Sequence, residues 1–157
     1  MSKRRIRVRN SRIHGRGVFA AVDLEAEIPL IRYRGRLRSH DDADQLYDGS
    51  LDSGHTFLFT LNDQYVVDGN HDSNSARWIN HSCDPNCETI IHESADGDPR
   101  RDEVWVYTLR DIAAGEELSF NYGIVLSVRH TARMKAIWAC HCGANNCTGT
   151  MLQPKPR

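Results

Sequence analysis

The sequence predicts an α+β domain that is mostly β, built from small sheets and followed by a cysteine-bearing segment. Three observations predict this fold class. Short runs rich in Val, Ile, Phe, Tyr and Trp recur along the chain, and several alternate apolar with polar residues. Helix-like patterns are few, and the chain has no internal repeat or long low-complexity tract. Three of the five cysteines lie beyond residue 139.

The strand-like runs follow one another with polar connections. In chain order the expected strands are GVFAA (17–21), IPLIRYR (28–34), FLFTL (57–61), QYVVD (64–68), ETIIH (88–92), EVWVYTL (103–109) and ELSFNY (117–122). LNDQ (61–64) predicts a hairpin turn, and the polar stretch 93–102 predicts a connector. Ser39 is the expected N-cap of one helix, and 127–138, which lacks Gly and Pro, predicts a second short helix.

Composition limits the class of protein. The 157 residues, 39% hydrophobic and 26% charged, suit one globular domain that buries its own core. MSKRRIRVRN at the start is basic, but no apolar run follows, so we expect no secretory signal and no membrane span. A cytoplasmic location is the default expectation, with export to a host cell or the nucleus left open.

The net charge of −1 conceals an uneven distribution. Residues 1–40 hold 11 Lys or Arg against 3 Asp or Glu, 41–117 hold 4 against 18, and 118–157 hold 5 against none. An acidic middle would attract a basic peptide. Charge alone favours the simpler interpretation that solvated faces differ by chance.

The C-terminal cysteines indicate a metal site. Cys140, Cys142 and Cys147 form a C-x-C-x4-C cluster, and structural zinc takes four ligands. The candidates for the fourth ligand are Cys83, Cys87, His81 and His141. A disulfide between Cys140 and Cys142 is the alternative, but so short a loop would be strained. Five cysteines also fit poorly with a full disulfide framework.

Three ordered motifs indicate a family. RWINHSCDPNC (77–87), GEELSFNYG (115–123) and CHCGANNCTGTM (140–151) together resemble the SET-domain protein lysine methyltransferases with a C-terminal zinc segment, the post-SET segment. The stretches 13–27 and 30–39 also resemble the opening of that family. The resemblance implies a SET domain over 5–125, with a knot-like core, and a post-SET segment over 126–152.

The resemblance also implies a cofactor, S-adenosylmethionine, with S-adenosylhomocysteine as product. The implied cofactor-binding residues are Gly15, Arg16, Gly17, Arg77, Asn80, His81, Tyr122, Met151 and Leu152. For Met151 and Leu152, simple packing of the C-terminal segment is an equal alternative. In the family pattern Cys83 is the fourth ligand of one structural zinc ion, which leaves Cys87 as a small buried hydrophobe.

For catalysis the resemblance points to Tyr122, Phe120 and Tyr33. The Tyr122 hydroxyl would orient the lysine amine, Tyr33 would line the site, and the residue at position 120 would limit the number of methyl groups. Phe120 has no hydroxyl, so we expect products up to di- or trimethyl-lysine. Two residues depart from the family pattern, Arg36 for an acidic residue and Asn121 for an aspartate, and they put the preferred peptide sequence in doubt.

Two other functions are compatible with parts of the sequence. A catalytically silent SET-like module could bind a basic protein or nucleic acid, and a bare zinc module could bind nucleic acid through the basic N-terminus. The second leaves Asn80 and Tyr122 unexplained. The expected partner is a lysine-containing basic protein, a histone or histone-like protein included. Membrane binding is not expected, nor is direct nucleic-acid binding, because base-stacking aromatics are not concentrated among the arginines. The oligomeric state is open.

Overall fold

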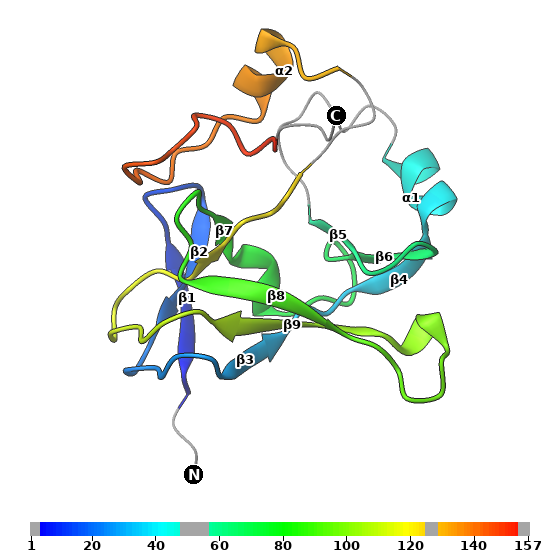
Figure 1. Cartoon of the computed structure of the whole chain (residues 1–157), viewed down its shortest axis with the longest axis horizontal. Helices are drawn as coiled ribbons and strands as arrows, with labels where there is room; N and C mark the ends of the chain where they lie inside the picture. The colour runs from blue at the N-terminus through cyan, green and yellow to red at the C-terminus, as the bar shows by residue number, and fades with distance from the viewer. Residues whose placement is uncertain (1–3, 48–56, 125–128, 154–157) are drawn as a thin grey trace.

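The computed structural model describes residues 4–47, 57–124 and 129–153, which form small β-sheets with two short helices (Figure 1). The strands are β1 (Ile6–Asn10), β2 (Arg16–Ala20), β3 (Pro29–Arg32), β4 (Arg36–Ser39), β5 (Leu58–Thr60), β6 (Tyr65–Asp68), β7 (Asn80–His81), β8 (Cys87–His92), β9 (Glu103–Thr108) and β10 (Ser119–Phe120). The α-helices are α1 (His40–Leu46) and α2 (Ala132–Ile137). Short 3₁₀ turns cover Ser75–Trp78 and Pro99–Arg101.

The strands pair in four groups within the described residues. β1 pairs with β2, β9 lies between β3 and β8, and β6 lies between β4 and β5, all antiparallel. β7 and β10 form a short parallel pair that brings residues 80–81 beside 119–120. These pairings join segments far apart in the sequence, and the parallel pair lies where the candidate site forms.

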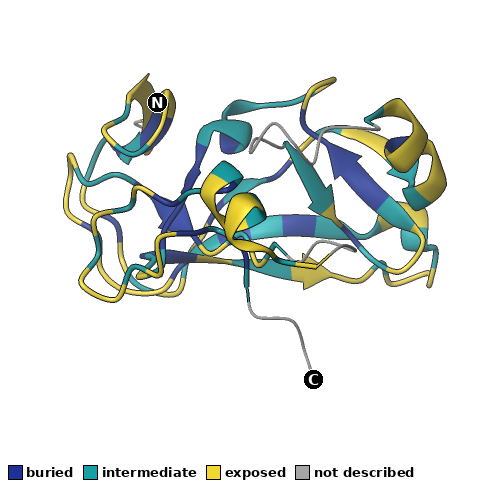
Figure 2. Cartoon of the chain, turned by 90° about the horizontal axis from the view of Figure 1, so that it is seen from above, coloured by how far each residue is buried: buried dark blue, intermediate teal, exposed yellow. Residues whose placement is uncertain are grey.

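Side-chain alternation explains how the sheets bury a common core. In β9, Val104, Val106 and Thr108 are buried, while Trp105 and Tyr107 point to the other face. Figure 2 shows buried residues concentrated in the strands and the two short helices largely exposed. Within the described chain no helix is long and apolar enough to cross a membrane.

Local signals explain the helices and the hairpin turn. Ser39 accepts a hydrogen bond from the backbone of Asp42 at 3.1 Å and caps α1, as expected. Thr131 caps α2, which is shorter than the expected helix over 127–138, whose residues 127 and 128 lie outside the described residues. Between β5 and β6, the side-chain oxygen of Asn62 accepts from two following backbone N–H groups at 3.0 and 2.9 Å, which makes the expected turn.

The C-terminal segment folds back onto the rest of the chain. Leu152 bridges to Ile124, and the backbone of Met151 donates to the carbonyl of Trp138 at 2.8 Å. Trp138 and Leu152 form a second, smaller hydrophobic cluster. The expected boundary at 125/126 lies outside the described residues, as do residues 154–157.

Candidate functional site

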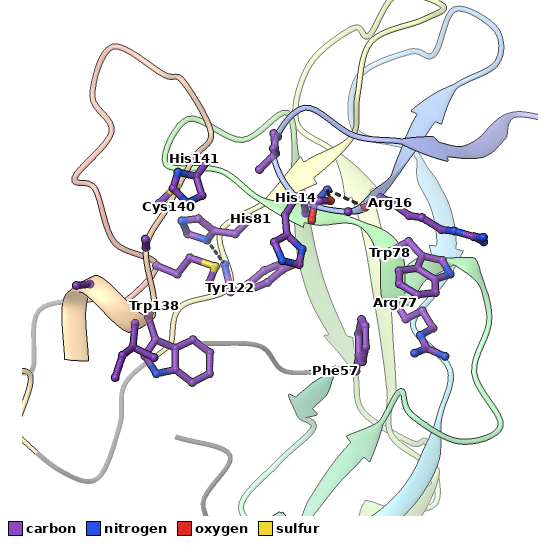
Figure 3. A pocket seen from close by; sticks show the side chains of 17 residues that line it. His14, Arg16, Phe57, Arg77, Trp78, His81, Tyr122, Trp138, Cys140 and His141 are labelled. Atoms are coloured by element: carbon purple, nitrogen blue, oxygen red, sulfur yellow. Dashed lines mark hydrogen bonds between the residues drawn. The ribbon is translucent and has the colours of Figure 1, made fainter. Parts of the chain in front are cut away.

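A cavity of about 320 Å³ lies between the β1–β2 loop, the segment around β7 and the C-terminal segment. Its lining residues are Ile13, His14, Gly15, Arg16, Phe57, Arg77, Trp78, Asn80, His81, Tyr122, Ala136, Ile137, Trp138, Ala139, Cys140, His141 and Met151. Figure 3 shows Phe57, Arg77 and Trp78 at one end, Trp138 at the other, and Tyr122 and His81 between them. One wall of the cavity therefore comes from the C-terminal segment.

A second cavity of about 40 Å³ adjoins the first. It is lined by Tyr33, Leu58, Phe59, Arg77, Ile79, Phe120, Tyr122 and Ile124. Arg77 and Tyr122 line both cavities. The two spaces thus meet at these side chains, and the narrower one is lined by aromatic and aliphatic side chains together with Arg77.

Tyr122 is held at this junction by both its backbone and its hydroxyl. The hydroxyl donates to the carbonyl of Ile79 at 2.5 Å, and the backbone N–H donates to Nδ1 of His81 at 3.0 Å. Burial raises the pKa of Tyr122, so the phenol stays neutral at ordinary pH. Its ring centroid lies 5.0 Å from that of Phe120, as expected for residues two apart on a strand.

Aromatic rings make the narrow cavity. Tyr33 lies 5.5 Å from Phe59, and Phe59 lies 6.2 Å from Phe120, measured between ring centroids. The hydroxyl of Tyr33 donates to the carbonyl of Phe57 at 2.7 Å, and burial raises its pKa. Tyr33, Phe120 and Tyr122, the three expected catalytic positions, are therefore brought together around one small space.

Asn80 fixes the loop between β1 and β2. Its amide nitrogen lies 3.2 Å from the carbonyl of His14 and 3.0 Å from that of Arg16, and also 3.0 Å from a Glu117 carboxylate oxygen. Gly15 in this loop has a φ of +43°, and no atom lies within 4 Å of where its Cβ would be. The side-chain N–H groups of Asn80 thus shape the cavity wall, and the open approach over Gly15 fits a ligand close to the backbone.

Two of the expected cofactor-binding residues do not line the larger cavity. A Cβ on Gly17 would lie 2.6 Å from Glu117 Oε2, so a larger residue there would displace the Glu117 carboxylate. Leu152 is 4% exposed and packs in the C-terminal cluster, whereas its neighbour Met151 lines the cavity. Trp138 does both, since it lines the cavity and packs against Leu152.

Arg77 places positive charge at one end of the cavity. Its guanidinium carbon lies 4.2 Å from the ring centroid of Phe57 and 4.5 Å from that of Trp78. Its Nε is buried and has no hydrogen-bond partner in the described part of the chain. The guanidinium of Arg16 lies 5.7 Å from the Trp78 centroid. These cations stacked on aromatic rings can receive an anionic group.

His81 connects Tyr122 to the cysteines. Burial lowers its pKa to about 4, so the ring is neutral. Because Nδ1 accepts from the backbone of Tyr122, the ring proton lies on Nε2, which is 3.7 Å from Sγ of Cys83. A neutral imidazole in this tautomer donates toward a sulfur atom, which suits a thiolate there.

The cysteine cluster fits a tetrahedral metal site. The sulfur atoms of Cys83, Cys140, Cys142 and Cys147 all lie within 4.8 Å of one another. Those of Cys83 and Cys140 are 3.8 Å apart, close to the roughly 3.8 Å expected for Zn–S bonds of about 2.3 Å. All five cysteines are free of disulfides. Although burial opposes it, backbone hydrogen bonds from Cys83 and Ala144 lower the pKa of Cys142 to about 6, which favours a thiolate ligand.

The structure resolves the choice of fourth ligand. Cys83 completes the group, while Cys87 is fully buried on β8, where burial raises its thiol pKa to about 12. His141 lines the larger cavity. Cys87 is thus the spare cysteine.

Some lining residues were not expected from the sequence. His14, Phe57, Trp78 and His141 all line the larger cavity. Trp78 follows Arg77 directly and carried the clearest signal of the four, as an aromatic residue within a candidate motif. Phe57 belongs to an expected strand, and its sequence context is that of an ordinary core residue.

Comparison with known proteins agrees with this geometry. The family model of the SET domain matches residues 15–123. The chain is 36% identical over 146 residues to the histone-lysine N-methyltransferase ATXR7 of Arabidopsis thaliana, covering 92% of this chain and 10% of that protein. It is 34% identical over 149 residues to the H3 lysine-4 specific histone-lysine N-methyltransferase of Saccharomyces cerevisiae, covering 94% of this chain and 13% of that protein.

A solved structure is similar in fold. The Polycomb Repressive Complex 2 of Chaetomium thermophilum, in an autoinhibited conformation bound to S-adenosylmethionine, matches with a TM-score of 0.67 and 32% identity. The match covers 78% of this chain and 15% of that chain. The chain described here thus spans only a small fraction of the proteins to which it is similar.

Proposed function

Because the chain belongs to the SET-domain family, we propose that it is a protein-lysine N-methyltransferase that uses S-adenosylmethionine. The observation that carries the proposal is the pair of cavities that meet at Tyr122. A methyl donor in the wide cavity and a lysine side chain in the narrow one would approach each other there. The relatives named as histone-lysine methyltransferases support the same activity.

The wide cavity suits the two ends of S-adenosylmethionine. Arg16 and Arg77 at one end would neutralise the carboxylate. Trp138 lies at the other end, and Met151 packs against the cluster that contains it, so both offer apolar surface for the adenine. Gly15 lets the ligand lie close to the backbone. A zinc ion held by the four cysteines would keep the C-terminal wall in place.

When bound, S-adenosylmethionine supplies an electrophilic methyl group on a sulfonium. A lysine nitrogen held in the narrow cavity would bond to that methyl carbon as its bond to sulfur breaks, with the electron pair staying on sulfur and S-adenosylhomocysteine as the product. A lysine amine has a pKa of about 10.4 in water, so it must first lose a proton to solvent. The positive charges of the sulfonium and of Arg77, which also lines the narrow cavity, both favour the neutral amine.

Tyr122 would orient that amine. Its hydroxyl hydrogen is used by the carbonyl of Ile79, so its oxygen is left to accept a hydrogen bond from the amine. Most of the rate would come from holding nitrogen and methyl carbon in line at contact distance. Phe120 beside Tyr122 adds no polar atom to the narrow cavity, which supports products up to di- or trimethyl-lysine.

The substrate class we propose is a basic protein that carries lysine, with histones and histone-like proteins as the first candidates. The names of the relatives support this class. A cytoplasmic site of action is the default proposal. Direct delivery to chromatin in a host cell or in the nucleus is compatible with the same chemistry.

The test is transfer of labelled methyl groups to recombinant histones and to a lysine peptide array, with mass spectrometry of the acceptor. We expect label on lysine with the wild-type chain. The chain could bind S-adenosylmethionine in calorimetry and yet label no lysine in any substrate. That result would refute the proposed methyltransferase activity and support a catalytically silent module. Absence of both binding and transfer would refute the cofactor pocket as well.

A further inference from the structure

The β1–β2 hairpin carries positive charge that methyl transfer does not use. The six arginines within residues 4–16 are all exposed, and the first 22 residues contain neither Asp nor Glu. None of these arginines takes part in an ion pair with another residue that the structure describes. Elsewhere, exposed arginines such as Arg100, Arg101 and Arg110 are paired with carboxylates.

Two of the six arginines make contacts elsewhere in the molecule. Arg5 donates to the backbone carbonyls of Pro29 and Leu30 at 3.2 and 3.1 Å, which fastens β1 to β3. Arg16 turns toward the ring of Trp78 in the larger cavity. Within the described part of the chain, no hydrogen bond is seen for the guanidinium groups of Arg7, Arg9 and Arg12.

Register places two of these free cations on one face. Arg7 pairs with Phe19 and Arg9 with Gly17 across the hairpin. The alternate residues face the other way, where Val18 is fully buried in the core. Arg7 and Arg9 therefore stand on the outer face, roughly 7 Å apart along the strand.

The hairpin is hollowed on this face and adjoins the site. Arg7 and Arg9 line a shallow hollow of about 300 Å³ together with Phe19 and Gly115. The loop that connects β1 to β2 contributes His14 and Gly15 to the wall of the larger cavity. Figure 1 shows β1 and β2 together on the side of the molecule away from α1. An anion bound to Arg7 and Arg9 would thus lie on the same hairpin whose loop forms part of the wall of the larger cavity.

We propose that this hairpin binds the phosphate backbone of double-stranded DNA. Duplex DNA carries one negative charge per about 1.7 Å of its axis, and arginines bind it without regard to sequence. The expectation of no nucleic-acid binding rested on missing aromatic residues, which matter for stacking on single strands and not for phosphate contacts. An anionic membrane fits less well, because Val8 is the one large apolar side chain exposed on the described hairpin.

The choice of DNA over another polyanion rests on the proposed function. DNA wraps around histones and histone-like proteins, so an enzyme that methylates their lysines encounters phosphate groups next to its substrate. Basic residues beside the cofactor cavity would hold the enzyme on the nucleoprotein while a lysine-bearing tail enters the narrow cavity. The same residues would contribute nothing to a free peptide.

The test replaces Arg7, Arg9 and Arg12 together by Gln. The matched control replaces Arg100, Arg101 and Arg110 by Gln, which changes the net charge equally but at sites already paired with carboxylates. Binding of a short fluorescein-labelled DNA duplex is measured by anisotropy over a range of salt concentrations. Circular dichroism and thermal unfolding check that both variants fold.

We expect the hairpin variant to bind at least about tenfold more weakly, with a log–log salt slope lower by roughly 2 to 3. The control should stay within about twofold of wild type. Equal weakening in both variants, or no DNA binding by the wild type, would overturn the proposal. Binding of phosphatidylserine vesicles by a chain that does not bind DNA would also overturn it. So would a hairpin variant that keeps its DNA affinity but self-associates, because the arginines would then serve to protect the edge of β1.

Methylation separates this inference from the proposed function. With free histone H3 as substrate, the hairpin variant should match the wild type, whereas on nucleosomes its rate should fall in line with its DNA affinity. A wild-type chain that binds DNA through the hairpin but methylates no lysine would refute the enzyme alone. A wild-type chain that methylates histone H3 without binding DNA would refute only the proposed DNA binding by the hairpin.

Discussion

The proposed mechanism depends most on the hydroxyl group of Tyr122. Tyr122→Phe removes it while the ring still packs against Phe120. We expect methyl transfer to fall by orders of magnitude, with cofactor affinity nearly unchanged. The lost hydrogen bond to Ile79 should lower the free energy of unfolding by about 1 kcal/mol. Single-turnover kinetics, calorimetry and denaturant unfolding measure the three quantities.

Tyr107→Phe is the control for that change. Tyr107 is a half-buried tyrosine on β9 whose hydroxyl contacts His92 at 3.0 Å, outside both cavities. Its replacement should leave the rate within about twofold of wild type. Near-normal turnover by Tyr122→Phe would remove Tyr122 from its role.

Phe120 should decide how many methyl groups are added. In Phe120→Tyr a new hydroxyl enters the narrow cavity and can hold water beside the lysine nitrogen. The amine that already carries methyl groups then has less room to turn its lone pair to the next sulfonium. We expect products to shift toward monomethyl-lysine with little loss of the first transfer, as read by mass spectrometry of a saturated reaction. A wild type that stops at monomethyl-lysine would contradict this assignment.

At the scale of elements, a buried carboxylate holds β4, β6 and α1 together. Asp68 is fully buried and accepts from Nε of Arg38 at 2.7 Å and from the hydroxyl of Tyr47 at 2.6 Å. Burial opposes the charge, but hydrogen bonds from Tyr47 and Arg38 outweigh it and lower the pKa of Asp68. Asp68→Asn leaves the cation without its partner, so we expect a loss of about 3 kcal/mol in unfolding free energy near neutral pH.

The pH dependence of this loss has a definite sign. A lowered pKa in the folded state means that the unfolded state takes up protons first as pH falls. The contribution of Asp68 is therefore fully present above about pH 4 and is lost below it. Urea unfolding of both proteins from pH 7 to pH 3 should show wild type and variant converging in acid. A constant difference across that range would contradict the role of the charge.

The zinc site joins the C-terminal segment to the strand that carries His81. Cys83→Ser should remove bound zinc, whereas Cys87→Ser should retain it, because only Cys83 lies in the four-sulfur group. Cys140→Ser should also weaken cofactor binding, since Cys140 lies in the wall of the larger cavity. Metal analysis and calorimetry check these outcomes. Equal zinc loss in both, or loss only in Cys87→Ser, would contradict the ligand assignment.

Elements with strong local signals were predictable from the sequence, and exposed ones were not. The run that forms β8 contains adjacent β-branched residues, the run that forms β9 has valine at alternate positions, and Ser39 marks the start of α1. β1 and β4 were not expected, because arginine alternates with single apolar residues there and nearly every side chain is exposed or half-buried. β1 and β4 are strands because they pair with β2 and β6, and the sequence of a single segment does not reveal such pairing.

At the scale of the whole molecule, the sequence predicts the site only for residues that lie in recognisable motifs. The four cysteines and the pairing of Phe120 with Tyr122 followed from spacing and family resemblance, and the structure brings both groups together. Gly17 and Leu152 were expected from the same family resemblance, yet the Cα of Gly17 faces Glu117 and Leu152 packs in the C-terminal cluster. Long-range packing decides which face of a motif meets the cavity.

The wall made by the C-terminal segment ties two binding events to one another. Residues 138–141 line the larger cavity, and Cys140 and Cys142 belong to the four-sulfur group, so ordering this stretch for one purpose orders it for the other. Thermodynamic linkage then requires reciprocity: by whatever factor zinc tightens the nucleoside ligand, that ligand tightens zinc. A methyl donor at its cellular concentration would accordingly help to retain the bound zinc, and depletion of the methyl donor would make the zinc easier to remove with a chelator.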